Sequence, residues 1–146
     1  MGTMEEELLA ALEQPICAGD VRVLSQAEKD AANRVLLEMF PWSGSWPDWS
    51  ATLNHQRRQQ DNGSLVDKDF RLFFDDCLQG RFTEVAYFAN DALDLALLGT
   101  VAKFRDYISA FIDTLQTNYF FAADGRWCLT LFTDGEMNYG ETPNLK

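Results

Sequence analysis

Residues 118–140 read NYFFAADGRWCLTLFTDGEMNYG, and this stretch decides the fold class. The dipeptides Asp124-Gly125 and Asp134-Gly135 interrupt it, and Asp-Gly between alternating runs is a strong signal for a tight turn between antiparallel strands. These turns separate three runs at ten-residue spacing, namely 118–123, 126–133 and 136–140. In the central run apolar side chains fall on both faces, which is typical of a strand in the middle of a sheet. The stretch therefore predicts an antiparallel meander.

A second pair of predicted strands precedes the meander. Apolar residues alternate with others over 83–89 and again over 92–98, and Asn90-Asp91 separates the two runs. Period-two alternation with two turn residues between the runs is typical of a β-hairpin. Hairpin and meander together predict an antiparallel sheet of about five strands, drawn from the last two-thirds of the chain.

Helical spacing of apolar residues marks further segments, each with a capping residue at its start. We expect helices over about 4–14, which Pro15 ends, over about 25–40, from Asp67 to a left-handed stop at Gly80, and from Thr100 to Leu115. Capping boxes at the first two starts pair Thr3 with Glu6 and Ser25 with Glu28. The residues expected to face the core are Ala27, Ala31, Val35 and Met39 in the second helix, Phe70, Phe73, Phe74, Cys77 and Leu78 in the third, and Phe104, Ile108, Phe111, Ile112 and Leu115 in the last.

Length and composition indicate a single folded domain over residues 1–146. The chain has 146 residues, 47% of them hydrophobic, which is enough apolar surface to build one core and excludes wholesale disorder. The predicted fold class is α+β, with an antiparallel sheet of about five strands packed with three to four helices. No internal repeat is visible.

The segment from Pro41 to about Ser64 has no periodicity and is expected to be irregular. It contains Trp42, Trp46 and Trp49, three indoles within eight residues, which are costly to leave in water. They could fold back onto the core beneath the loop. Alternatively, one or two of them could form the aromatic anchor of a protein interface beside Asp48, or line a ligand groove. The neighbouring Arg57-Arg58 pair is expected to neutralise local acids.

The charge balance is strongly acidic. Twelve Lys and Arg stand against 23 Asp and Glu, which gives a formal net charge of −11. Such a field repels phosphate backbones and anionic membranes, so direct binding to nucleic acid or to a membrane is disfavoured. It attracts basic proteins, although solubility alone is the other explanation of an acidic surface.

Cysteine usage and the N-terminus indicate the cytoplasm. Cys17, Cys77 and Cys128 are odd in number and form no CxxC pair, so neither a disulfide framework nor a zinc site is expected. Cys77 and Cys128 are expected to be buried as small hydrophobes. The first residues lack the positive region of a secretion signal, and no apolar run has the length of about 18 residues that a membrane span requires.

No recognised catalytic motif is present, because GxSxG, HExxH, GxxxxGK[ST] and GxGxxG are all missing from the sequence. The single histidine, His55, lies in a polar stretch and is expected on an exposed loop. The carboxylate pairs Asp67/Asp69 and Asp75/Asp76 do not have the spacing of a compact metal cluster, and Asp75 is expected to pair with Lys68 or Arg71. Asp106 and Asp113 are expected on a solvated helix face. We therefore expect no catalytic residue, metal or cofactor.

The region from about Glu84 to Gly140 resembles the C-terminal hairpins of small bacterial immunity proteins, which accompany polymorphic toxins or the toxins of contact-dependent growth inhibition. The resemblance rests on the aromatic strand, the Asp-Gly turns, the Trp-Cys-Leu strand start and the final Tyr-Gly. It implies a cytosolic antidote that binds one cognate toxin domain, often a basic nuclease, and blocks its active site or an exosite. Such families diverge most at their toxin-binding surfaces, so it assigns no binding residue.

Charge and exposure then suggest where a basic partner would bind. One candidate acidic patch joins Asp48 to the tryptophan segment, and a second lies on the third predicted helix. The predicted partner-binding residues are Trp46, Asp48, Trp49, Asp69, Asp76, Asp134 and Glu136.

Two other functions remain open at this point. The chain could be an acidic mimic of nucleic acid that inhibits a DNA-binding enzyme, its carboxylates standing in for phosphates. It could also be a small hydrolase in which His55 works with a carboxylate from the segment Asp67 to Asp76.

Overall fold

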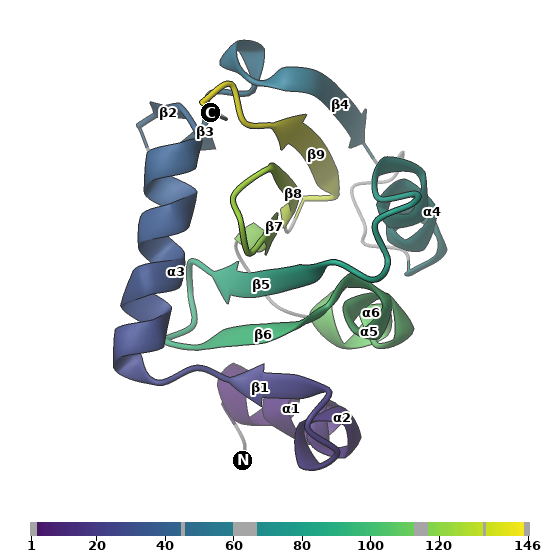
Figure 1. Cartoon of the computed structure of the whole chain (residues 1–146). Coiled ribbons are helices and arrows are strands. Elements are labelled where there is room, and N and C mark those ends of the chain that lie inside the picture. The colour runs from purple at the N-terminus through teal and green to yellow at the C-terminus, as the bar shows by residue number, and fades with distance from the viewer. Residues whose placement is uncertain (1–2, 45, 60–66, 113–116, 133, 145–146) are drawn as a thin grey trace.

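The fold is a curved seven-stranded antiparallel sheet with helices on both faces (Figure 1). The computed structural model describes residues 3–44, 46–59, 67–112, 117–132 and 134–144. The strand order is β1-β6-β5-β7-β8-β9-β4, so the meander occupies the middle. The strands are β1 (Val21–Val23), β4 (Leu53–Gln59), β5 (Val85–Asn90), β6 (Ala96–Thr100), β7 (Thr117–Ala122), β8 (Trp127–Phe132) and β9 (Glu136–Glu141).

The α+β class is confirmed, but the predicted count of five strands is too low. The two extra strands, β1 and β4, come from the first 60 residues and form the two edges of the sheet. All seven residues of β4 are exposed, so no apolar alternation marks the segment that was expected to be an irregular loop. Its register with β9, from Leu53 opposite Glu141 to Gln59 opposite Glu136, assigns it to the sheet.

The meander itself is confirmed. β7 pairs with β8 from Thr117 opposite Phe132 to Phe121 opposite Cys128, and β8 continues the ladder with β9. Gly125 and Gly135 take φ values of +80° and +91°, which residues with a Cβ rarely adopt. A Cβ on Gly125 would also lie 2.5 Å from Cγ of Met39. Both the backbone conformation and the lack of space therefore require glycine at this turn.

The predicted hairpin of β5 and β6 is also present, from Val85 opposite Thr100 to Ala89 opposite Ala96. Its connection is longer than the expected two residues, because β6 begins only at Ala96. Asn90 organises this longer turn: its side-chain oxygen accepts the backbone N–H of Ala92 at 2.7 Å.

One face of the sheet carries the larger core, centred on Phe120. Five other phenylalanine rings surround that ring with centroid distances between 5.1 and 6.0 Å, in tilted or edge-to-face arrangements. Such pairs add to the stabilisation that burial of the rings provides. These rings are Phe70 and Phe74 from α4 (Asp67–Cys77), Phe88 from β5, Phe104 from α5 (Val101–Asp106) and Phe111 from α6 (Ile108–Ile112).

The helices on this face differ from their predictions at two breaks. The segment after Thr100 forms two short helices, α5 and α6, because the backbone leaves helical geometry at Tyr107. The expected helix 4–14 divides into α1 (Met4–Ala11) and α2 (Glu13–Cys17) at Leu12. Pro15 does not end the helical segment as expected, because it lies in the first turn of α2. Backbone N–H groups in a first turn have no partner within the helix, so proline is tolerated there. Leu115 and Asp113 lie outside the described residues.

The other face is crossed by the helix α3 (Gln26–Met39). Its predicted capping box is present: Ser25 Oγ accepts the backbone N–H of Glu28 at 3.3 Å, and the Glu28 carboxylate accepts that of Ser25 at 3.0 Å. The predicted core face of this helix is rotated, because Ala27 and Ala31 are exposed. Ala32 and Leu36 are buried against the sheet, and the predicted Val35 and Met39 pack partly buried beside them.

The cysteines are free thiols. Cys17 is exposed, and Cys77 and Cys128 are buried as expected. Burial raises the pKa of the Cys77 thiol to about 12, so it stays protonated at neutral pH. None of the helices in the described part of the chain combines the length and the hydropathy that crossing a bilayer requires.

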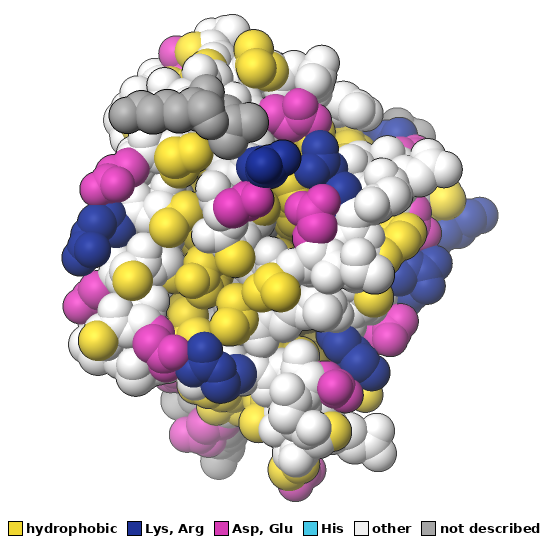
Figure 2. Space-filling model, viewed as in Figure 1, with side chains coloured by type: hydrophobic (Ala, Val, Ile, Leu, Met, Phe, Trp, Pro, Cys, Tyr) yellow, Lys and Arg dark blue, Asp and Glu magenta, His cyan; other side chains and the backbone are white. Residues whose placement is uncertain are grey.

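Ion pairs within the chain engage many of its basic side chains. Arg22 pairs with Glu28, Arg57 with Glu136 and Arg58 with Asp76, at N–O distances between 2.5 and 3.2 Å. On the side of the molecule seen in Figure 2, acidic and basic side chains lie next to one another around a band of apolar ones.

Replacing Phe120 by alanine should lower the free energy of unfolding by about 3–5 kcal/mol, because it leaves a cavity among five rings. Chemical denaturation monitored by circular dichroism measures this loss. The control is Leu72→Ala on α4, where the side chain is 48% exposed and the expected change is within about 0.5 kcal/mol. Similar losses for both variants would contradict the assignment of Phe120 to the centre of the core.

Candidate interaction surface

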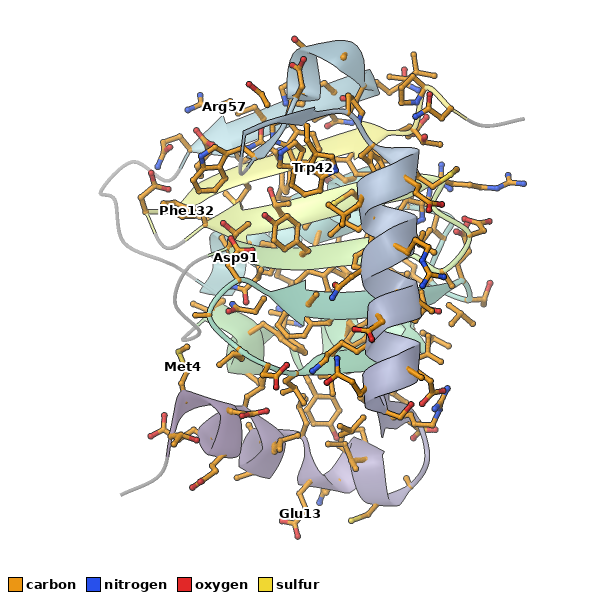
Figure 3. All side chains as sticks on the ribbon, turned by 90° about the vertical axis from the view of Figure 1, so that its left-hand side faces the viewer. Met4, Glu13, Trp42, Arg57, Asp91 and Phe132 are labelled. Atoms are coloured by element: carbon orange, nitrogen blue, oxygen red, sulfur yellow. The ribbon has the colours of Figure 1, made fainter. Side chains whose placement is uncertain are left out.

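The face of the sheet under α3 is only partly covered by that helix (Figure 3). Leu24, Ala32, Leu36 and Phe40 pack with the sheet residues Tyr119, Phe121 and Cys128 to form a second, smaller core. Beside α3, Figure 3 shows Trp42, Phe132 and Asp91 over the part of the sheet that the helix leaves open. This open part is the candidate interaction surface.

A two-stranded hairpin made by the tryptophan segment covers one end of this area. Its strands are β2 (Trp42–Ser43) and β3 (Trp46–Pro47), and the short helix η1 (Trp49–Ala51) follows. The Trp42 indole N–H donates to the carbonyl of Leu36 at 3.4 Å, and the backbone N–H of Asp48 donates to the carbonyl of Pro41 at 2.8 Å. The first bond fastens the hairpin to the C-terminal half of α3, and the second joins the two residues that flank the hairpin.

The three tryptophans of this segment have different environments. Trp42 tilts over Tyr119 with ring centroids 6.2 Å apart, and Trp49 stacks on His55 at 5.6 Å; both pack against the smaller core. Trp46 is 47% exposed and rests edge-on against Phe132, 5.0 Å away. Two of the indoles thus fold back, as the first interpretation expected, while Trp46 presents its ring to solvent.

Between α3, the hairpin and the sheet lies a hollow of about 400 Å³, which we call the α3 hollow. Leu36, Leu37 and Trp42 supply apolar walls, and Tyr119 supplies an aromatic ring on the sheet. The full lining is Asn33, Leu36, Leu37, Trp42, Gly44, Ala89, Asn90, Asp91 and Tyr119. Asn33, Asn90 and Asp91 add polar side chains to the apolar ones, and binding sites commonly combine the two kinds of group.

Asp91 contributes the only ionisable carboxyl group among these lining residues, and the turn after β5 places it there. The side chain of Asn90, just before it, donates to Asn118 at 2.8 Å and is buried. The backbone N–H of Asp91 donates to the carbonyl of Thr117 at 3.3 Å. These bonds anchor the turn to β7 and fix the Asp91 side chain at the rim of the hollow.

The surroundings of Asp91 are unfavourable for its charge. Although the residue is exposed overall, desolvation raises the pKa of its carboxyl group, and the hydroxyls of Thr117 and Tyr119 offset this only in part. Within the described ranges no Lys or Arg forms an ion pair with it. Thr117 is 2% exposed, and its Oγ1 has no hydrogen-bond partner of standard geometry.

The structure gathers several sequence-predicted residues near this hollow. Asp134 and Glu136 flank the turn that follows Phe132, on which Trp46 rests. The Asp134 carboxylate accepts the backbone N–H of Glu136 at 2.9 Å, and Glu136 accepts two hydrogen bonds from Arg57 at 2.7 and 3.1 Å. Asp48 immediately precedes η1, and its carboxylate accepts the Ser50 hydroxyl at 2.6 Å.

Asp69 and Asp76 lie elsewhere, on α4 and therefore on the opposite side of the sheet. A groove of about 500 Å³ between α4 and α5 includes Asp75, Asp76 and Asp106. Asp75 pairs with Arg105 through two hydrogen bonds of 3.0 Å, not with Lys68 or Arg71 as expected, because α5 packs beside α4. The two predicted acidic patches are therefore separate surfaces.

His55 lies on the edge strand β4, where a loop was expected. Its Nε2 is 2.9 Å from the side-chain oxygen of Asn138, and its ring stacks on Trp49, so it faces the α3 side. The carboxylates of α4 lie on the other side, so the fold does not bring together the pair that a hydrolase reading requires. No three His, Cys, Asp or Glu side chains in the described residues converge as a metal site would need.

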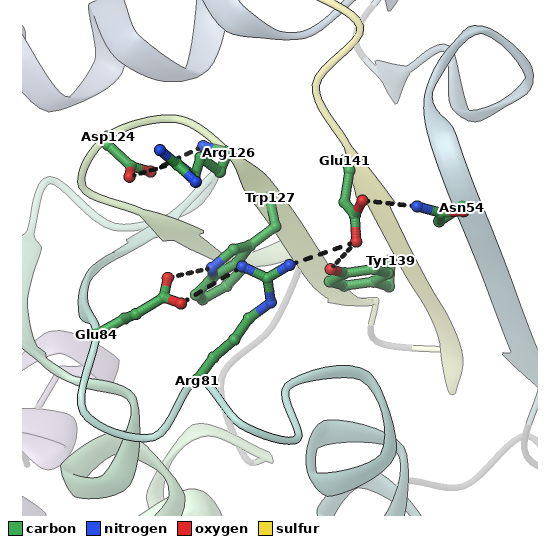
Figure 4. Close-up of polar contacts among 8 residues, drawn as sticks. All are labelled: Asn54, Arg81, Glu84, Asp124, Arg126, Trp127, Tyr139 and Glu141. Atoms are coloured by element: carbon green, nitrogen blue, oxygen red, sulfur yellow. Dashed lines mark hydrogen bonds and ion pairs between the residues drawn. The ribbon is translucent and has the colours of Figure 1, made fainter. Parts of the chain in front are cut away.

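At the opposite end of β5 lies a polar cluster that is satisfied internally (Figure 4). The indole N–H of the buried Trp127 donates to Glu84 at 3.1 Å, and Arg81 pairs with both Glu84 and Glu141. Tyr139 donates its hydroxyl hydrogen to Glu141 at 2.7 Å. With charges and donors paired in this way, the cluster holds the sheet together and offers no unpaired group to a ligand.

Sequence reasoning missed the centre of the candidate surface, which is Asp91 with Leu37 and Tyr119. Asp91 was assigned to a turn, correctly, but a turn residue carries no sign of what packs beside it. Leu37 is 61% exposed on α3, and the predicted core face of that helix is one residue away from the observed buried residues Ala32 and Leu36. Only the docking of α3 on the sheet brings these residues together.

Replacing Asp91 by asparagine should raise the free energy of unfolding at pH 7. Because the pKa of Asp91 lies above its ordinary value of 3.8, the ionised carboxylate lowers stability, and this loss disappears as the pH falls through the raised pKa. Denaturation of wild type and variant between pH 4 and pH 8 measures the difference, which should shrink toward acid. The control is Asp94→Asn in the same loop, which breaks a pair with Lys29 and should lower stability by at most about 1 kcal/mol. A larger loss for Asp91→Asn at pH 7 would refute the assignment.

Comparison with known proteins adds no family to this description. No model of a protein family matches the chain, and no curated protein matches it at a significant level. The candidate surface is therefore defined by the geometry and charge of its own residues.

Proposed function

We propose that this chain is an immunity protein that binds a basic toxin domain through its α3 side. The observation that carries the proposal is the combination, on one surface, of exposed apolar side chains with carboxylates that have no cationic partner. Trp46 and Leu37 are exposed there, and Asp91 and Asp134 form no ion pair within the described residues. Protein interfaces combine such aromatic anchors with a charged rim.

Net charge supports a basic partner in particular. With a formal charge of −11 and much of its Arg and Lys already paired internally, the chain has an excess of negative charge for a partner to neutralise. Long-range attraction raises the association rate and excludes acidic competitors, while buried aromatic contacts supply most of the affinity. Neutralising a basic nuclease by this means requires no bond-making by the chain itself.

The mimicry of nucleic acid receives less support from the geometry. Carboxylates that stand in for phosphates must be available to the enzyme they inhibit. Asp75 and Asp76, the adjacent pair on α4, are each engaged by an arginine of the same chain. The α3 side has a few acidic residues around apolar side chains. Such a surface is suited to binding another protein, and it does not resemble the continuous row of charges on a phosphate backbone.

Coexpression of the tagged chain with the product of the adjacent upstream gene should give a stable complex with that product. Replacing Trp46 by alanine should weaken it at least tenfold, because the exposed indole becomes buried in the interface. Calorimetry or surface plasmon resonance measures the dissociation constant. The matched control is Leu72→Ala, since Leu72 is 48% exposed against 47% for Trp46 but lies on α4, across the sheet.

Two results would overturn this proposal. One is a neighbouring gene product that does not bind the chain. The other is a complex that Leu72→Ala weakens and Trp46→Ala leaves intact, which would move the interface to the α4 side. Binding to several unrelated DNA enzymes, with a steep loss at high salt, would favour the mimic of nucleic acid instead.

A further inference from the structure

We propose that the α3 hollow receives an arginine side chain of the partner, with the guanidinium group on Asp91 and the methylene stem along Leu37 and Trp42. This inference rests on the proposed function and goes beyond it, because it names the partner's chemistry at one site. Three features of the hollow support it: its volume, the lack of a cation paired with Asp91 among the described residues, and its apolar and aromatic walls.

Size limits what the hollow can hold. Its volume of about 400 Å³ lies near the lower end of the 300–1,000 Å³ that is common for binding sites. It is bounded by α3, the β2–β3 hairpin and the sheet, so an entering group must come from the solvent side as a protruding side chain would. A long side chain with some bound water fits this space, whereas a folded segment of a partner would not enter it.

The polar end of the hollow lacks a cation. Asp91 has no ion pair within the part of the chain that the structure describes, and its charge is supported only by the neutral hydroxyls of Thr117 and Tyr119, which donate hydrogen bonds to its carboxylate. These two hydrogen bonds offset the desolvation of the carboxylate only in part, so the group that is missing is a donor with positive charge. A guanidinium can donate two parallel hydrogen bonds to the carboxylate.

The apolar walls distinguish arginine from a small cation. Leu36 and Leu37 offer a surface for methylene groups, and Trp42 and Tyr119, whose rings pack on each other with centroids 6.2 Å apart, add an aromatic wall. Arginine covers apolar surface with its stem and stacks its planar head on aromatic rings, whereas the ammonium of lysine is more strongly hydrated. A metal ion or free ammonium would leave these walls unused.

Nuclear magnetic resonance with a small probe tests the site directly. N-acetyl-L-arginine amide, titrated into the full chain, should shift the Trp42 indole and the Leu37 methyl signals saturably. N-acetyl-L-lysine amide should bind more weakly, and the uncharged N-acetyl-L-norleucine amide should produce no saturable shift. Asp91→Asn should weaken binding of the arginine amide at least tenfold. The control Asp106→Asn removes an exposed carboxylate on the other side of the sheet and should bind as the wild type does.

The inference is overturned if the norleucine amide binds equally well, if Asp91→Asn binds as the wild type does, or if the shifts centre on the groove between α4 and α5. A well-dispersed spectrum of Asp91→Asn shows that the variant is folded, so a loss of binding reports on the site. Self-association of the wild type that Asp91→Asn abolishes would also overturn it, because the occupant would then be a second copy of this chain.

A final measurement separates this inference from the proposed function. If the upstream gene product binds the wild type and Asp91→Asn equally tightly, the proposed function stands and the arginine site is refuted. If the arginine amide binds as expected but that gene product does not, the chemistry of the hollow stands and the proposed function is refuted. If the complex forms and Asp91→Asn weakens it at least tenfold, both are supported.

Discussion

The central strands β7 and β8 are apolar on both faces, and the rest of the structure follows from the need to cover them twice. On one face, five helices enclose Phe120 and the rings around it. On the other face α3 is the one long helix among the residues that the structure describes. A helix is about 10–12 Å wide, whereas a six-residue strand such as β7 is about 20 Å long. A single helix laid across the strands therefore covers about half of their length. The tryptophan hairpin covers part of the remainder, and the α3 hollow is what is left.

This incomplete coverage explains why the candidate surface lies where it does. Apolar side chains that a second helix would have buried remain at the surface, and Trp46 and Leu37 are the most exposed of them. Asp91 sits among them at the end of β5, held by bonds from the buried Asn90 and from its own backbone. A carboxylate in such surroundings lowers the stability of the isolated chain, and binding sites commonly retain groups of this kind. The polar cluster at the other end of β5, where every charge is paired, shows the contrasting arrangement.

The sequence predicted the elements whose residues carry a local signal. The Asp-Gly turns, the capping box at Ser25 and the phenylalanine spacing of α4 all depend on near neighbours, and each appears in the structure. The edge strand β4 was missed because both of its faces are exposed, so its residues do not alternate. The break at Tyr107 and the join at Leu12 were missed because apolar spacing continues across both. Such breaks depend on how the helices fit the curved sheet.

For the candidate site too, the sequence predicted local features and the tertiary structure decided which of them share a surface. Composition alone established the acidic charge, and the tryptophan segment and the turn at Asp134 were visible as candidates. Which of them share a surface depends on strand order, because β4 and β9 bring residues 53–59 beside 136–141. The face that each helix covers separates Asp76 from Trp46 and brings Asp91 and Leu37 to the same hollow. Local patterns in a sequence specify single elements, whereas contacts between residues far apart in the chain arise only when those elements pack.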